Sequence, residues 1–348
     1  MSRPWFLLKA DLDAPDVRLQ GLRADPPPDA PPDPGAVADA LERALGPQQS
    51  VEVLGWTRGT FHWVARVRQG DRTEVAARFL RLDLPVLREG LRVGAETAAL
   101  AREGGLPAPE PLHGVAPALD DLPPLAVSRW VEGSPLSGRD HDEPAVERAL
   151  GELGGHLRRL HGVTGSGAGP LAPGRAEAAA PTGRHPSWAG YLGCRLEEHL
   201  AACHALGSLG ASEAAEVRRS LMGAEWWDAG PVDRLLHGDA GPANLVVETR
   251  GAVAGLLDWE DAMVGDPVFE LASCASFHPE RRWPALFEGY LGRASLPASL
   301  AGRFWRYSLR LALARTVARG RFGLGDLPGR QPAAARIQRA LAALARAG

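Results

Sequence analysis

Lysine is almost absent from this sequence of 348 residues: Lys9 is the only lysine among 39 basic side chains, and the others are arginines. A phosphate-facing cation beyond the first residues of the chain therefore has to be an arginine. Positive charge is not in excess either, because 42 acids give the chain a formal net charge of −3. A net charge this close to zero does not favour binding to nucleic acid or to a membrane surface.

Cysteine is scarce and long apolar runs are missing. The three cysteines, Cys194, Cys203 and Cys274, are widely spaced and odd in number, which favours reduced thiols over a disulfide framework or a zinc site. No apolar run approaches the roughly 18 residues that span a bilayer. The opening residues carry early acids and only a short apolar stretch, unlike a secretory signal. We therefore expect a cytoplasmic protein without a membrane segment.

Length and composition indicate two lobes. With 348 residues, 45% of them hydrophobic and 23% charged, the chain can form two hydrophobic cores. Residues 1–48 form a predicted N-terminal extension. Its Pro/Asp-rich segment at 22–35 excludes a helix or an interior strand, and a short helix is expected at 36–46. We assign no function to this extension.

Residues 49–132 have the pattern of a small, mostly antiparallel sheet interrupted by one helix. Leucines at helical spacing predict that helix over 85–103. Strands are expected at 50–56, 61–70, 73–82, 112–118 and 124–133. Residues 133–348 read as a second, mainly helical lobe, with helices predicted at 143–163, 188–206, 211–223 and on to the C-terminus. The predicted fold class is therefore α+β, with a sheet lobe followed by a larger helical lobe.

Four polar residues surround two short apolar runs between positions 235 and 259. His237, Asp239 and Asn244 read H-x-D-x-x-x-x-N, and Asp258 follows fourteen residues after Asn244. The runs at 245–249 and 252–259 predict a two-stranded ribbon, which brings Asn244 and Asp258 to one end. Side-chain oxygens of this kind can hold Mg²⁺ together with substrate phosphates. Asp239 is left to accept a proton from an attacking hydroxyl or to orient it.

This division of labour is that of kinase-type phosphoryl transfer, in which positioning and charge neutralisation do most of the work. Each short motif alone has a simpler interpretation: a lone His-Gly-Asp is more often a turn with a satisfied histidine. The combination of H-x-D-x-x-x-x-N with a ribbon and a later Asp-Trp is much more specific. We expect His237 to brace the loop by hydrogen bonding and not to transfer a proton.

The stretch resembles the aminoglycoside phosphotransferase family, which shares a bilobal protein-kinase-like fold with choline and homoserine kinases. Within the family, the sequence around Asp258 looks most like that of the hygromycin phosphotransferase branch. The resemblance implies that Asp239 is the catalytic base or orienting carboxylate. It also implies that Asn244 and Asp258 bind Mg²⁺ beside the phosphates of ATP or GTP. The matching residues are His237-Gly238-Asp239, Asn244, Gly255, Asp258-Trp259 and Gly265-Asp266-Pro267.

A kinase-like sheet lobe needs a strand cation on the phosphates and a helix carboxylate paired with it. The strand "EVAARFLR" is similar to the kinase V-A-I-K strand and places Arg78 at the lysine position. Glu96 on the 85–103 helix is the predicted partner, with Glu89 as the alternative. For either glutamate a solvated helix face is the simpler interpretation.

The segment that joins the lobes, "AVSRWVEG", is the predicted hinge. If the resemblance holds, the backbone of Arg129, Trp130 and Val131 hydrogen-bonds the nucleotide base. Without it, the same segment reads only as an edge strand.

The charge of the C-terminal region bears on the phosphate acceptor. Residues 281–348 contain thirteen arginines and two acids, Glu288 and Asp326. A strongly cationic acceptor needs carboxylates instead, because like charges repel. Glu260, Asp261 and Glu270 supply some negative charge, and Glu260 and Asp261 are the candidate acceptor contacts, although helix-surface acids are the simpler interpretation. We therefore favour a nucleoside or another sugar-containing antibiotic that is not strongly cationic, ahead of a hygromycin-like aminoglycoside.

Three classes of protein compete. The favoured one is an antibiotic kinase for resistance or self-protection, acting on the hydroxyl of a small natural product. A metabolic small-molecule kinase of choline or homoserine type is the second. The third is a pseudokinase or protein kinase, which the intact Asp239, Asn244 and Asp258 and the lack of a D-F-G sequence argue against. No nucleic-acid or membrane partner is expected, and the sequence leaves the oligomeric state open.

Overall fold

The computed structural model describes residues 30–45, 50–59, 61–70, 73–81, 83, 85–116, 122–138, 141–172, 180–222, 230–322 and 332–347. Of the predicted extension at 1–48, residues 1–29 and 46–48 lie outside this range. In the part of the chain that is described, no helix is both long and apolar enough to cross a membrane.

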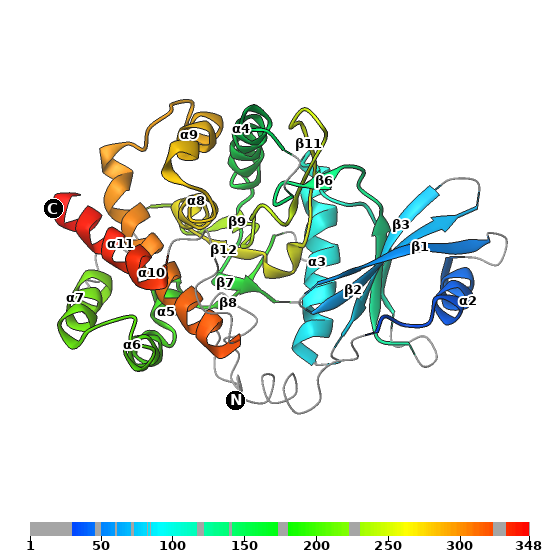
Figure 1. The fold of residues 1–348 in the computed structure, drawn as a ribbon, viewed down its shortest axis with the longest axis horizontal. Helices are drawn as coiled ribbons and strands as arrows, with labels where there is room; N and C mark the ends of the chain where they lie inside the picture. Colours follow the sequence, from blue (N-terminus) through cyan, green and yellow to red (C-terminus); the bar gives the residue numbers. More distant parts are fainter. Residues whose placement is uncertain are drawn as a thin grey trace.

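A five-stranded antiparallel sheet forms one end of the molecule, and most helices gather at the other end, with α3 between them (Figure 1). The order of its strands is β1-β2-β3-β5-β4. This confirms the expected sheet lobe. The strands are β1 Val51–Arg58, β2 His62–Gln69, β3 Thr73–Leu80, β4 Pro111–Ala116 and β5 Leu125–Arg129.

The two faces of this sheet are covered by different helices. Helix α2, Pro34–Leu45, buries Val37 and Leu41 against one face, next to Ala77 and Phe79 of β3. Side chains alternate along a strand, so Arg78 points to the opposite face. That face is covered by α3, Pro85–Glu103, which has the bounds that the leucine spacing predicts. Arg78 thus faces the interior between the lobes.

The second lobe holds two small sheets among its helices. One sheet has the order β11-β10-β6 and the other β8-β7-β12-β9. Their strands are β6 Ser134–Pro135, β7 Ala168–Leu171, β8 Gly183–His185, β9 Arg234–Leu236, β10 Leu245–Val247, β11 Val253–Leu256 and β12 Met263–Gly265. The helices are α4 Glu143–Leu160, α5 Trp188–Gly193, α6 Leu196–Ala205, α7 Ala211–Met222, α8 Pro267–Ala275, α9 Trp283–Leu291, α10 Ala298–Phe322 and α11 Ala333–Ala347. Short 3₁₀ turns, η2 Trp259–Asp261 and η3 Glu280–Arg282, precede β12 and α9.

The single helix predicted at 188–206 is wrong, because the structure divides it into α5 and α6. Arg195 between them has a left-handed backbone, with φ of 54°. The guanidinium of the fully buried Arg310 donates to the carbonyl of Leu192 at 2.8 Å and to that of Cys194 at 2.7 Å. These carbonyls at the end of α5 are therefore satisfied by a side chain of α10 and need no continuing helix.

Helices α4 and α9 cross closely because glycines face each other at the crossing. A Cβ placed on Gly154 would overlap the carbonyl oxygen of Leu286 and lie 2.7 Å from the backbone nitrogen of Tyr290. The neighbouring Gly155 is different: the nearest atom to its Cβ would be the Gly289 oxygen, at 3.9 Å. One glycine of the pair is needed for packing and the other is not.

We predict opposite effects for alanine at these two neighbours. Gly154→Ala should lower the free energy of unfolding by about 1–3 kcal/mol, because an overpacked crossing has to open. Gly155→Ala should raise that free energy by up to about 1 kcal/mol through helix propensity alone. Denaturant unfolding of both variants measures the difference. Equal effects would contradict the close crossing.

Candidate active site

The loop after β9 is held by a buried carboxylate from α8. Glu270, which is 1% exposed, accepts the backbone N–H of His237 at 3.0 Å and that of Gly238 at 2.7 Å. His161, the residue directly after α4, donates to the same carboxylate from Nε2 at 2.8 Å. Burial alone would raise the pKa of Glu270, but these donors outweigh it and the pKa is lowered. The carboxylate therefore stays ionised and fixes the backbone that leads into Asp239.

Gly238 has to be glycine for two reasons. Its φ is 86°, in the left-handed region that favours glycine. A Cβ at this position would also overlap the carbonyl oxygen of Asp261 in η2. This close approach brings the loop that carries Asp239 directly against the turn that follows Asp258.

His237 links the loop to the ribbon. Its Nε2 donates to the carbonyl of Leu257 at 3.0 Å, and its Nδ1 accepts the backbone N–H of Asp239 at 3.2 Å. Burial lowers the pKa of His237, so the ring is neutral at physiological pH. One ring nitrogen is bonded to the ribbon and the other within the loop, which is the geometry of a bracing residue.

Asn244 contacts Asp239 directly. Its Nδ2 donates to the backbone oxygen of Asp239 at 2.9 Å and to Oδ2 of the carboxylate at 3.0 Å. Strands β10 and β11 pair in antiparallel register, with Leu245 opposite Leu256. The backbone N–H of Leu257 donates to the backbone carbonyl oxygen of Asn244 at 2.7 Å. The ribbon thus places Asn244 and Asp258 at the same end, as the sequence predicts.

Asp258 adopts an uncommon backbone conformation at this point. Its φ of 63° and ψ of 64° lie in the left-handed region, which aspartate tolerates better than most side chains. Its side chain is 29% exposed, and Oδ1 accepts a hydrogen bond from Nη2 of Arg78 at 2.8 Å. Residues far apart in sequence, one from each lobe, therefore meet here.

Arg78 pairs with a carboxylate that the sequence did not assign to it. Nη2 donates to Oε1 of Glu260 at 2.6 Å, and Nε2 of His62 lies 3.2 Å from the same oxygen. Burial would lower the pKa of Arg78, but Glu260 and then Asp258 outweigh it and raise that pKa. The guanidinium is held charged between the two carboxylates.

The predicted Arg78–Glu96 pair is therefore wrong. Helix α3 has glycines at positions 90 and 94, and a Cβ on either would lie 3.0 Å from Glu260. Glu260 fills the groove that these glycines leave, and from there it reaches Arg78. Glu96 lies two residues after Gly94, about 200° around the helix, on the other face. The alternative, Glu89, pairs with Arg184 at 2.9 Å.

Glu260 was also predicted as an acceptor contact, and its buried position argues against that role. Its side chain is fully buried against α3 and faces the sheet lobe. Asp261 lies close enough to Arg78 to raise the pKa of that guanidinium. Neither side chain lines the cavity that lies between α8, α10 and α11 in the helical lobe. Their positions follow from η2, which folds the chain back beneath α3 directly after Asp258.

The hinge has fewer available donors than the sequence suggested. The N–H of Arg129 already donates to the carbonyl of Glu110 at 2.8 Å, and that of Trp130 to the carbonyl of Glu74 at 2.9 Å. Within the described ranges no hydrogen bond involves the N–H of Val131. Of the three predicted residues, only Val131 keeps its backbone donor for a ligand.

Sequence reasoning missed the residues that support the loop. Glu270 was named only as a source of negative charge near the acceptor, and His161 was not singled out, because a glutamate in an apolar helix and a lone histidine carry no spacing signal. Gly90 and Gly94 did carry one: two glycines four residues apart share one face of a helix and predict a close neighbour there. That signal could have pointed to Glu260.

We predict that Glu270→Gln lowers the free energy of unfolding by about 1–3 kcal/mol, because the amide leaves one buried N–H without an acceptor. Glu288→Gln on the exposed side of α9 is the control and should change it by less than about 0.5 kcal/mol. The pKa of Glu270 is lowered in the folded state, so its stabilisation is present above the unfolded carboxyl pKa of about 4.3.

That stabilisation is lost as the pH falls through the lower folded pKa. Denaturant unfolding as a function of pH should therefore show the Glu270→Gln deficit at neutral pH and a smaller deficit in acid. A deficit that does not depend on pH would contradict an ionised Glu270.

Comparison with known proteins identifies the family. The model of the phosphotransferase enzyme family matches residues 62–305. Viomycin phosphotransferase of Streptomyces vinaceus is 30% identical over 254 residues, which cover 70% of this chain and 79% of that protein. Hygromycin-B 4-O-kinase of Escherichia coli is 26% identical over 193 residues, covering 54% of this chain and 53% of that protein.

Solved structures agree on the fold. A variant of aminoglycoside phosphotransferase APH(4)-Ia, in a ternary complex with AMP-PNP and hygromycin B, matches with a TM-score of 0.62 at 22% identity. The match covers 90% of this chain and 99% of that one. Macrolide 2'-phosphotransferase MphH of Brachybacterium faecium matches with a TM-score of 0.59 at 20% identity, covering 90% and 98%. The chain therefore belongs to the phosphotransferase enzyme family and has its bilobal, kinase-like fold.

Proposed function

We propose that the protein transfers the γ-phosphate of ATP or GTP to a hydroxyl group of a small-molecule antibiotic, and so confers resistance or self-protection. The observation that carries the proposal is the meeting of Asp239, Asn244, Asp258 and Arg78 at the junction of the lobes. The names of the viomycin and hygromycin-B relatives support an antibiotic as acceptor. The neighbour crystallised with AMP-PNP and hygromycin B supports a nucleotide as donor.

Asp239 is the proposed catalytic residue. The acceptor oxygen forms a bond to the γ-phosphorus, the bond from that phosphorus to the bridging oxygen breaks, and the nucleoside diphosphate leaves. The hydroxyl proton passes to the carboxylate of Asp239. Asn244 orients this carboxylate through its Nδ2 hydrogen bond. His237 holds the loop in place and is neutral, so it need not exchange protons.

Asn244 and Asp258 are the proposed magnesium ligands. The donor set fits: the Asn244 nitrogen is used on Asp239, which leaves its amide oxygen as the ligand atom, and the Asp258 carboxylate is 29% exposed. Oxygen ligands of this kind suit Mg²⁺ when phosphates complete the shell. The ion, when bound, would neutralise charge on the phosphates of the nucleotide.

The nucleotide would lie between the sheet lobe and the ribbon. Arg78 is the proposed phosphate contact, held in place by Glu260, and Val131 is the proposed hinge donor to the base. Residues 49–132 then form the nucleotide-binding lobe, and residues 133–348 form the catalytic and acceptor-binding lobe. We expect the protein to act in the cytoplasm, where nucleotide is available.

Three groups of compounds are candidates for the acceptor. A nucleoside or other sugar-containing antibiotic that is not strongly cationic is favoured by the arginine-rich C-terminal region. A hygromycin-like aminoglycoside is the alternative that the relatives favour. A metabolic acceptor of choline or homoserine type is the third.

We predict that the wild-type protein with Mg²⁺ and ATP or GTP phosphorylates one class in an acceptor panel. The panel spans aminoglycosides, viomycin, nucleoside antibiotics, macrolides, choline and homoserine. Asp239→Asn should lower kcat by about 10²–10⁴-fold, because the proton acceptor is lost. Nucleotide affinity, measured by calorimetry, should change little. Silence of the wild type across the panel with no nucleotide binding would overturn the proposed function.

A second prediction separates Glu260 from Glu96 as the partner of Arg78. Glu260→Gln should weaken nucleotide binding about tenfold, about 1.4 kcal/mol, because Arg78 loses its buried carboxylate and is drawn further onto Asp258. Glu96→Gln on the other face of α3 is the matched control and should leave the affinity unchanged. Thermal unfolding checks that both variants are folded. If Glu96→Gln weakened nucleotide binding and Glu260→Gln did not, Glu96 would be the functional partner of Arg78.

A further inference from the structure

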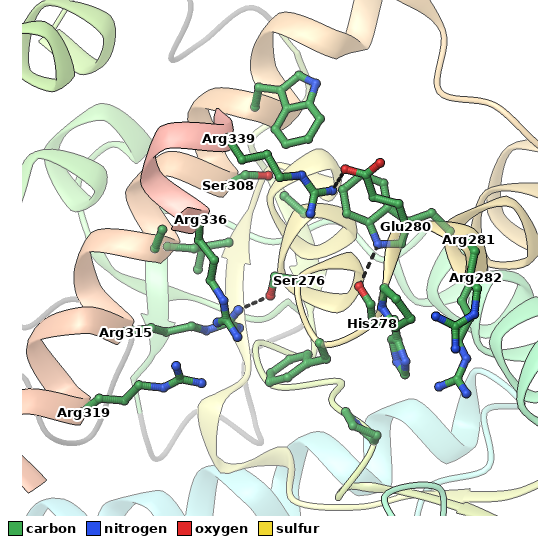
Figure 2. Close-up of a pocket in the computed structure, with 18 residues that line it drawn as sticks. Ser276, His278, Glu280, Arg281, Arg282, Ser308, Arg315, Arg319, Arg336 and Arg339 are labelled. Atoms are coloured by element: carbon green, nitrogen blue, oxygen red, sulfur yellow. Dashed lines mark hydrogen bonds and ion pairs between the residues drawn. The ribbon is translucent and has the colours of Figure 1, made fainter. Parts of the chain in front are cut away.

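A cavity of about 620 Å³ lies in the helical lobe between the end of α8, the long helix α10 and the last helix α11. Its lining contains six arginines and one acid, Glu280. Figure 2 shows these arginines on two sides of the cavity, with Arg281 and Arg282 on one and the α10 and α11 arginines on the other. The six are Arg281, Arg282, Arg315, Arg319, Arg336 and Arg339.

Arg281, Arg282 and Arg339 face carboxylates of the described part of the chain. Arg281 lies 3.4 Å from Glu143, and Arg282 donates to the same carboxylate at 2.7 Å. Arg339 pairs with Glu280. Two carboxylates thus offset part of the charge of these three arginines, on the side of the cavity formed by η3 and Arg339 of α11.

Arg315 has a different set of partners. Its Nη2 donates to the hydroxyl of Ser273 at 2.9 Å and its Nη1 to that of Ser276. The guanidinium also lies over the ring of Phe277, 4.4 Å from its centroid. Among the described residues no carboxylate lies within ion-pair distance of Arg315. A cation held by hydroxyls and a ring keeps its charge available to a ligand.

The electrostatics around Arg315 support this. Burial lowers the pKa of Arg315 to about 10, and the positive charges of Arg336 and Arg319 act in the same direction. Asp239 acts in the opposite direction. Arg315 is therefore close enough to interact with both the arginine cluster and the proposed catalytic carboxylate. At neutral pH it remains charged.

The cavity adjoins the turn between Asp239 and Asn244. Pro242 of this turn lines it. A Cβ on Gly241 would lie 3.2 Å from the ring of Phe277, another lining residue, so the wall of the cavity packs directly on the turn. The cavity therefore adjoins the turn that follows Asp239.

We infer that the phosphate acceptor carries an anionic group, a carboxylate or a phosphate, which is bound in this cavity by Arg315, on the wall that Arg319 and Arg336 also line. The inference rests on the proposed function, because it takes the cavity as the acceptor site. Arginine forks match carboxylate and phosphate oxygens. A polycationic acceptor would bring like charges together on this side of the cavity, which disfavours it.

Anion binding can be measured without knowing the natural acceptor. The full chain is loaded with Mg²⁺ and AMP-PNP, which fills the nucleotide site, and is titrated with four probes by calorimetry. Inorganic phosphate and D-glucuronate test the two anionic groups. D-Glucose and D-glucosamine present a similar sugar ring without charge and with a positive charge. We expect the anions to bind and the neutral and cationic sugars to bind at least about tenfold more weakly. If inorganic phosphate binds more tightly than D-glucuronate, the anionic group of the acceptor is a phosphate. The opposite order indicates a carboxylate.

Three variants assign the binding to the cavity. Arg315→Gln should weaken anion binding about tenfold. Arg336→Gln should do the same and serves as the second variant if Arg315→Gln fails to fold. Arg346→Gln, exposed in the last turn of α11, is the matched control and should bind as the wild type does.

The outcomes separate this inference from the proposed function. Equal binding of glucosamine and glucuronate, absence of anion binding, or anion binding untouched by both cavity variants would overturn the inference. Phosphorylation of a cationic antibiotic with unchanged KM in Arg315→Gln would overturn it while the phosphotransferase proposal stands. Anion binding that needs Arg315, in a protein that binds no nucleotide, would support the anion site and defeat the proposed function.

Discussion

The geometry of the site depends on the buried carboxylate of Glu270. It accepts the N–H groups of His237 and Gly238, which lie in a turn that no strand or helix would satisfy. With that backbone fixed, the ring of His237 can reach both Leu257 and the N–H of Asp239. The loop and the ribbon are then one unit. A glutamate on α8 thereby positions an aspartate that it does not touch.

The same segment also connects the lobes. After Asp258 the chain turns sharply, and Glu260 enters the groove that Gly90 and Gly94 leave on α3. The carboxylate that holds Arg78 is therefore supplied by the helical lobe and not by the helix of the sheet lobe. Arg78 is bound to Glu260 and Asp258 together, so the position of the proposed phosphate contact is coupled to that of a proposed metal ligand.

Local patterns predicted the parts of the molecule that local chemistry decides. The bounds of α3, the strands of the first sheet and the ribbon that joins Asn244 to Asp258 follow from periodicity and turn residues. The errors have tertiary causes. The break between α5 and α6 depends on Arg310, more than a hundred residues later in the chain. The wrong partner for Arg78 came from transferring a family arrangement to a helix whose glycines accommodate a different carboxylate.

The near-absence of lysine has a physical consequence at the arginine cluster. Burial lowers the pKa of Arg315 to about 10, which still leaves it charged at neutral pH. A lysine begins about two units lower, so the same burial would bring its pKa closer to neutral pH, where the charge starts to be lost. Arginine also spreads its donors over a planar fork, so that it can hold two serines and still face a ligand. A cavity that has to keep positive charge while shielded from water is therefore better built from arginine.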